Sequence, residues 1–93
     1  MLAGGVRLAG KDFDAGFYFA PTIIAGLSNE ARLCQDEVFG PVLAVLPFDD
    51  EDDLIAAADA SAYGLAAGIW TRDFTKAWRT ARALDAGTVW INT

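Results

Sequence analysis

The feature that most constrains the fold is a continuous apolar run at residues 42–48 (Val-Leu-Ala-Val-Leu-Pro-Phe), introduced by Gly40-Pro41. A run without polar alternation is typical of a strand buried on both faces, and such strands belong to parallel sheets. Pro47 ends the strand because proline has no backbone N–H to donate. The run therefore predicts a strand of an α/β fold with further layers around it.

Three other segments have the composition of strands. Residues 17–25 are aromatic and β-branched, and Pro21 places this strand near a sheet edge or a bulge. Residues 65–71 and 88–92 predict the remaining two strands. Residues 28–35 have no clean period and predict no element.

A first helix is predicted after the apolar run. Residues 49–53 are all acidic and stand where a helix would begin, since unpaired N–H groups and the helix dipole favour carboxylates there. We prefer this solvated, capped first turn to a metal site. Leu54, Ile55 and Ala58 form the inward stripe of the helix, which is expected to end near residues 63–64.

A second helix is predicted between the last two strands. Asp73 stands at its N-cap, and Gly87 is placed for its C-cap. The residues expected on its buried stripe are Ala77, Trp78, Ala81 and Leu84, with Lys76, Arg79 and Arg82 left in water.

The order of these elements predicts an α/β fold, with a mostly parallel sheet and right-handed crossover helices. Crossovers wound in one direction cover the same face of the sheet. The other face is then bare, so we expect a partner layer from a longer chain or another subunit.

Size and charge exclude several kinds of protein. With 93 residues the chain forms one small domain, residues 1–93, and not an enzyme with separate cofactor and substrate lobes. The net charge of −6 opposes binding to nucleic acid or to an anionic membrane surface. A single cysteine forms no internal disulfide, and no apolar stretch reaches the roughly 18 residues of a membrane span. We therefore expect a cytoplasmic location.

Cys34 is the only strong nucleophile in the chain. Asp36 and Glu37 lie within three residues of it and disfavour a thiolate, and the chain has no histidine to take its proton. We therefore interpret Cys34 as a small buried apolar residue. Gly4-Gly5 lacks the spacing of a dinucleotide-binding loop and predicts a turn or the start of a strand.

The most distinctive segment is Glu-Val-Phe-Gly-Pro-Val at residues 37–42. Taken alone, a surface acid and a packed phenylalanine are the default interpretation. The same residue types also suit a ligand, because a carboxylate accepts two hydrogen bonds from a vicinal diol and an aromatic side chain lies against a planar ring.

Six short motifs carry a resemblance to a known family. They are Phe-Tyr-Phe-Ala-Pro-Thr at 17–22, Glu-Val-Phe-Gly-Pro-Val at 37–42, Pro-Phe at 47–48, Tyr-Gly-Leu-Ala-Ala at 63–67, Trp-Thr-Arg-Asp at 70–73 and Ala-Gly-Thr-Val-Trp-Ile-Asn at 86–92. In this order and spacing the chain resembles the NAD(P)-dependent aldehyde dehydrogenase superfamily. The match runs from about Gly4 to Thr93 and is similar to the later part of the catalytic domain.

The resemblance implies roles for four residues. Glu37 would bind the hydroxyls of the nicotinamide ribose, and Phe39 would pack beside the nicotinamide of NAD or NADP. Leu65 would lie near the same end of the cofactor. Thr93 would line the aldehyde pocket.

Other family motifs are absent from these residues. The catalytic cysteine after a Gly-Gln motif, the glutamate base and the oxyanion-binding asparagine have no counterpart, and Cys34 does not match. The resemblance therefore implies a fragment of an enzyme that oxidises an aldehyde to a carboxylic acid. This fragment would be inactive alone and would need the rest of the chain or homo-oligomerisation.

The alternative is a non-enzymatic, acidic α/β interaction module that self-associates through its uncovered sheet face. An independent domain of ferredoxin-like type agrees less well with the crossover order.

Overall fold

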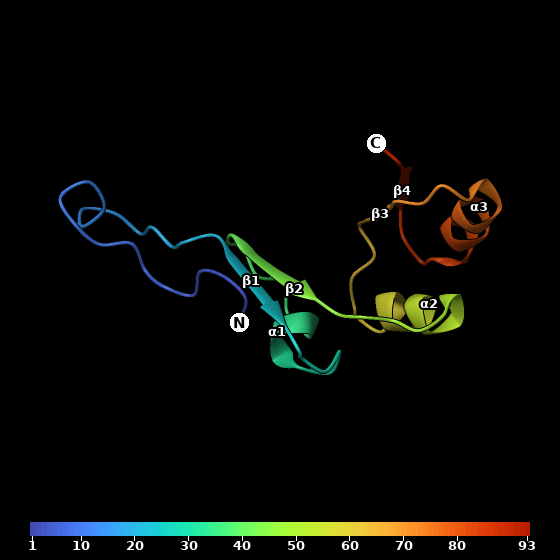
Figure 1. Cartoon of the computed structure of the whole chain (residues 1–93), viewed down its shortest axis with the longest axis horizontal. Helices are drawn as coiled ribbons and strands as arrows, with labels where there is room; N and C mark the ends of the chain where they lie inside the picture. Colours follow the sequence, from blue (N-terminus) through green and yellow to red (C-terminus); the bar gives the residue numbers. More distant parts are fainter. The chain divides into compact units, whose positions relative to one another are not determined.

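Two pairs of parallel strands organise the chain in a computed structural model that describes all 93 residues, Met1 to Thr93 (Figure 1). One pair lies in a unit formed by Met1–Pro47 and the other in a unit formed by Phe48–Thr93. A helix lies between the two strands of each pair in the sequence. The α/β class and the parallel pairing are therefore confirmed, although the ladders form two separate pairs and not one continuous sheet.

In the first unit, β1 (Thr22–Ala25) pairs with β2 (Val42–Val45), with Thr22 opposite Val42 and Ala25 opposite Val45. The strand expected at residues 17–25 begins only at Thr22, because Pro21 has no N–H for a ladder. Residues before it form an antiparallel arm through isolated bridges from Ala3 to Ile23 and from Arg7 to Phe19.

The glycine pair at the start of the arm approaches β1 closely. Gly4 and Gly5 have φ of 74° and 80°, and a Cβ on Gly4 would lie 2.2 Å from the Pro21 carbonyl oxygen. The Gly5 N–H donates to Thr22 Oγ1 at 2.8 Å. The turn or strand start predicted for this pair is therefore a left-handed segment held against Thr22.

One face of the β1–β2 pair is open. Val42 and Ala44 are half-buried, whereas Leu43 is 58% exposed and Val45 is also exposed. This alternation corrects the expectation that the run is buried on both faces. It agrees with the prediction that one sheet face is bare.

A one-turn helix, α1 (Arg32–Gln35), lies between β1 and β2 where no element was expected. Its N-cap residue, Ala31, has no side chain that could cap it. The Ala31 carbonyl accepts from the N–H groups of Cys34 and Gln35 at 2.8 and 3.1 Å. Four residues are too few to show a helical period in the sequence.

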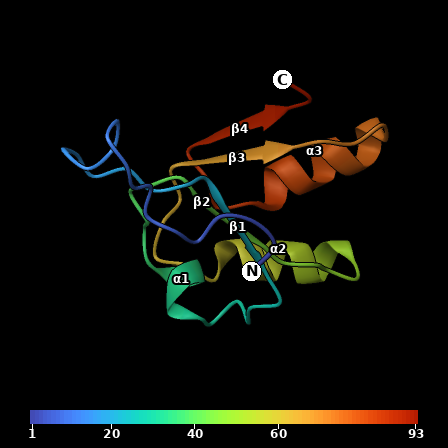
Figure 2. The same ribbon diagram turned by 60° about the vertical axis from the view of Figure 1, so that its left-hand side comes forward.

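The second unit contains α2 (Glu51–Asp59), β3 (Ala66–Ile69), α3 (Phe74–Ala83) and β4 (Thr88–Ile91). Figure 2 shows β3 and β4 side by side, with α3 along one side of the pair. Asp50 and Asp73 cap the two helices, accepting from the N–H groups of Asp53 and Lys76 at 2.9 and 3.0 Å. The two predicted helix starts are confirmed.

The first of these helices ends earlier than expected. α2 stops at Asp59, before residues 63–64, because the Ser61 hydroxyl bonds to the backbone N–H of Tyr63 at 3.3 Å and offers that segment an alternative to the helix. Leu54 and Ile55 are half-buried as predicted, whereas Ala58 is exposed.

The buried side of α3 also differs from the prediction. Ala77 and Thr80 are buried and Ala81 and Leu84 are half-buried, but Trp78 is 54% exposed. Successive helix residues are rotated by about 100°, so Trp78 points well away from Ala77.

The prediction that Gly87 is the C-cap of α3 was wrong. Leu84 is the C-cap residue, and Gly87 instead donates its N–H to the Gly64 carbonyl at 2.8 Å. A Cβ on Gly87 would lie 3.3 Å from the Leu65 carbonyl oxygen, so the glycine serves a close approach of two backbone segments. None of the helices reaches the length and hydropathy of a membrane-spanning helix.

Candidate functional site

The segment that carries Glu37 and Phe39 is a short loop between α1 and β2. Its first residue, Asp36, donates its N–H to the Arg32 carbonyl at 2.8 Å, and near its end the Pro41 carbonyl accepts from the Thr22 N–H at 2.8 Å. Between these points Gly40 donates to the Val38 carbonyl at 2.9 Å. The loop is therefore fixed at both ends, at the amino-terminal end of the parallel pair.

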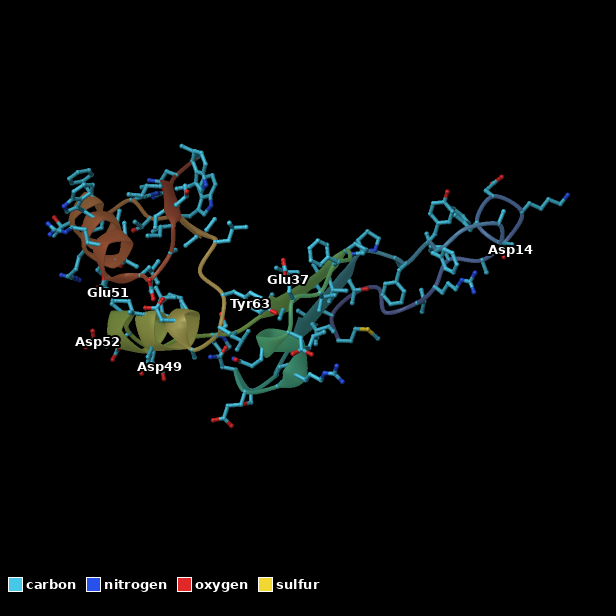
Figure 3. The ribbon with its side chains drawn as sticks, turned by 180° about the vertical axis from the view of Figure 1, so that it is seen from behind. Asp14, Glu37, Asp49, Glu51, Asp52 and Tyr63 are labelled. Atoms are coloured by element: carbon cyan, nitrogen blue, oxygen red, sulfur yellow. The ribbon has the colours of Figure 1, made fainter.

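Glu37 is an exposed carboxylate without an internal partner. The neighbouring carboxylate, Asp36, is engaged by the Arg32 guanidinium at 2.7 Å, so the one nearby cation is already paired. The Glu37 side chain makes no hydrogen bond or ion pair within the chain, and it projects outward from the ribbon (Figure 3). Both of its oxygens can therefore accept hydrogen bonds from an external diol.

Phe39 is 93% exposed, two residues beyond Glu37. The packed phenylalanine of the default interpretation is thus not present in this structure. Both faces of an exposed ring can contact a planar group or an apolar layer. In α/β sheets ligands usually bind beyond the carboxyl ends of the strands, whereas this loop lies at the amino end.

The other two predicted site residues lie in the second unit. Leu65 is 86% exposed and immediately precedes β3, whereas Thr93 is exposed and follows β4. Because β3 and β4 are parallel, the two residues lie at opposite ends of the strand pair. The structure brings Glu37 and Phe39 together on one loop and does not bring Leu65 and Thr93 together.

Asn92 connects the end of β4 to the segment after β3, a role that the sequence did not indicate. Its Oδ1 accepts from the Thr71 N–H and its Nδ2 donates to the Thr71 carbonyl, both at 2.9 Å. Its φ is 53°, a left-handed conformation that asparagine tolerates better than most residues. An open depression of about 580 Å³ lies beside it, lined by Trp70, Thr71, Arg72 and Asn92.

Cys34 lies half-buried in α1, so it is less buried than its interpretation as a small buried apolar residue expects. The chain contains no histidine, and no residue pairs with this thiol as a base. Glu37 and Phe39 can therefore contact a bound diol and a planar group. The same residues do not bring a nucleophile together with a base.

Comparisons with known proteins give a consistent result. A model of the aldehyde dehydrogenase family matches residues 1–93. The structure of indole-3-acetaldehyde dehydrogenase from P. syringae in complex with NAD+ and IAA is 47% identical over 99% of this chain, with a TM-score of 0.92. Betaine aldehyde dehydrogenase from Staphylococcus aureus in complex with NAD+ is 43% identical over 97% of the chain, with a TM-score of 0.92.

The structure of aldehyde dehydrogenase from Bacillus cereus is 42% identical over 97% of this chain, with a TM-score of 0.89. The chain covers 18% of each of these three proteins. Almost all of this chain is therefore matched by a small part of each longer enzyme.

Proposed function

The chain belongs to the aldehyde dehydrogenase family, and from this premise we propose that it supplies the wall of an active site that holds the nicotinamide ribose. Glu37 accepts hydrogen bonds from the two ribose hydroxyls, and Phe39 restricts the orientation of the nicotinamide ring. The observation that carries this proposal is the pairing of Asp36 with Arg32, which leaves Glu37 unpartnered next to an exposed aromatic ring.

The reaction to which this wall contributes is the oxidation of an aldehyde to a carboxylic acid with NAD+ or NADP+. The cofactor, when bound, accepts a hydride. Relatives whose structures contain NAD+ support this assignment. The nucleophile, its base and the groups that stabilise the oxyanion come from segments outside these 93 residues, because Cys34 has no base.

Leu65 and Thr93 keep the roles that the resemblance gives them, beside the cofactor and in the aldehyde pocket. Their exposure supports this, since neither side chain is committed to packing within the chain. The two units are then parts of one catalytic domain, to which the remaining segments of the enzyme contribute. The single unpaired cysteine supports a reducing compartment such as the cytoplasm.

The proposal can be tested by replacing the matched segment of the P. syringae indole-3-acetaldehyde dehydrogenase with this chain. We expect the chimera to oxidise its aldehyde with NAD+. Glu37→Gln in the chimera should raise KM for NAD+ by roughly tenfold or more, because a carboxylate bound to hydroxyls contributes about 1.5–3 kcal/mol.

The matched control is Asp36→Asn, a change of the same chemistry in the adjacent residue. Asp36 is paired with Arg32, so its variant should leave KM for NAD+ within about twofold of the parent chimera. Equal effects of the two variants would contradict the ribose assignment. Calorimetric titration of the 93-residue chain with NAD+, before and after Glu37→Ala, gives a second and independent measurement of the same contact.

A second candidate function is an interaction module that self-associates through the open face of the β1–β2 pair. The exposure of Leu43 and Val45 on that face favours it. Under the first proposal the rest of the enzyme covers the same face. Replacing Leu43 by serine should weaken self-association of the isolated chain only if the second candidate is correct.

A further inference from the structure

The start of β1 is hydrogen-bonded along both of its edges. Residues 1–20, which we call the arm, contact one edge, where Ile23 and Ala3 exchange two backbone hydrogen bonds of 3.0 and 3.3 Å. Residues 36–41, which we call the cofactor loop, contact the other edge. There the Thr22 N–H donates to the carbonyl of the last loop residue at 2.8 Å. The arm has no part in the proposed contacts with NAD+, so its role needs a separate explanation.

Thr22 joins the arm to the cofactor loop. Its side chain is buried, and Oγ1 accepts from the Gly5 N–H at 2.8 Å and donates to the Ala20 carbonyl at 2.7 Å. The hydroxyl is therefore bonded to both ends of the arm, while the backbone N–H of the same residue is bonded to the cofactor loop. The contact is close, since a Cβ on Gly4 would lie 2.6 Å from Thr22 Oγ1.

The cofactor loop has little freedom to absorb a displacement of its last residue. Gly40 donates its N–H to the Val38 carbonyl at 2.9 Å, and Val42 donates to the Gly40 carbonyl at 2.8 Å. These are two successive three-residue turns. Pro41 lies between them and has a fixed φ. Few backbone torsions are therefore free between Pro41 and Phe39, and the position of the ring follows from where β1 holds the Pro41 carbonyl.

We propose that Thr22 is a positioning residue for the cofactor loop. Its hydroxyl fixes the start of β1 to the arm, and its N–H fixes the loop from which Glu37 and Phe39 meet the nicotinamide end of NAD+. A loop that is fixed before binding loses little conformational entropy when the ligand binds, so Thr22 raises the affinity for NAD+ without contacting it. This inference rests on the proposed function.

Thr22→Val in the chimera with indole-3-acetaldehyde dehydrogenase tests the proposal, because valine keeps the shape and lacks the hydroxyl. We expect KM for NAD+ to rise about fivefold and kcat to change less than about twofold. A purely structural role gives the opposite pattern, since loss of folded enzyme lowers kcat and leaves KM unchanged. Thr22→Ser keeps the hydroxyl and should hold KM for NAD+ within about twofold of the parent chimera.

Combination with Glu37→Gln separates this inference from the proposed function. In the Glu37→Gln chimera, Thr22→Val should raise KM for NAD+ by only about twofold, because part of the contact that it positions is already lost. The matched control is Thr80→Val, the same change at an equally buried threonine in the other unit. It should leave KM for NAD+ unchanged.

Three results would overturn the positioning role. The first is a Thr22→Val chimera with unchanged KM for NAD+ when Glu37→Gln raises it, and the second is an equal rise from Thr22→Val in both backgrounds. The third is a Thr22→Ser chimera as impaired as Thr22→Val. If neither Glu37→Gln nor Thr22→Val changes KM, the ribose assignment itself fails.

Gly4→Ala replaces Thr22→Val if that chimera does not fold. The added Cβ displaces the arm from Thr22 and leaves the threonine side chain intact. It should also raise KM for NAD+ with little change in kcat, and an unchanged KM would overturn the proposal in the same way.

Discussion

At the scale of single residues, Thr22 joins the arm to the first strand pair. Its buried hydroxyl donates to the Ala20 carbonyl at 2.7 Å and accepts from the Gly5 N–H at 2.8 Å. Thr22→Val keeps the shape of the side chain but leaves the Ala20 carbonyl and the Gly5 N–H without this partner. We expect it to lower the free energy of unfolding by about 1–3 kcal/mol, measured by urea unfolding of the chain.

Thr22→Ser is the matched control because it keeps the hydroxyl and loses only a methyl group. It should cost about 1 kcal/mol, the contribution of one buried methyl or methylene group. Equal losses in the valine and serine variants would show that the two hydrogen bonds contribute nothing to stability.

Asn92 combines a side-chain role and a backbone role that substitution can separate. Asn92→Gly keeps the left-handed backbone accessible but removes both bonds to Thr71. Asn92→Ala removes the bonds and adds strain of about 1–2 kcal/mol. We therefore expect stability to fall in the order asparagine, glycine, alanine, measured by thermal unfolding, and an alanine variant as stable as the glycine variant would contradict the backbone argument.

At the scale of the elements, the two longer helices depend on their capping aspartates. Asp73→Ala removes the acceptor for the Lys76 N–H and should lower the free energy of unfolding by about 0.5–2 kcal/mol. Asp73→Asn should restore most of the loss, since asparagine caps as well as aspartate. Urea unfolding of the parent chain and the two variants measures the order of their stabilities. An asparagine variant as unstable as the alanine variant would contradict the capping role of Asp73.

The starts of α2 and α3 could be predicted because a side-chain N-cap is a local interaction between residues three positions apart. The exposure of Trp78 could not be predicted in this way. An apolar side chain favours burial, but the sequence does not show whether another part of the chain lies against it. α1 was missed because its N-cap residue, Ala31, carries no capping side chain and its four residues show no period. β1 is shorter than predicted because Pro21 has no backbone N–H to donate, although the residues before it have the aromatic and β-branched composition of a strand.

At the scale of the whole molecule, the candidate site could be predicted only through the resemblance. The local pattern showed a carboxylate and an aromatic residue that suit a ligand, and in the structure both are exposed on one loop that is hydrogen-bonded at both ends. Nothing local connects Glu37 with Leu65 or Thr93, which lie in the other unit. The common role proposed for these three residues rests on the resemblance alone.

The scarcity of buried side chains leads to the last prediction. Only Ala77, Thr22 and Thr80 are buried, and the aromatic side chain of Phe17 is fully exposed. Folded chains seldom leave so much apolar surface in water unless a partner covers it. We therefore expect the isolated chain to bind an apolar fluorescent dye strongly, and the chimera to bind much less of it.

The same isolated chain should produce no measurable aldehyde-dependent NADH. Hydride transfer requires a nucleophile and oxyanion donors held against the nicotinamide, and misplacing such groups removes most of the rate enhancement. Cys34→Ala should change nothing, because Cys34 is half-buried in a chain that has no histidine. NADH production that survives Cys34→Ala would require a hydride-transfer site built without a thiol, and a complete enzyme within these 93 residues.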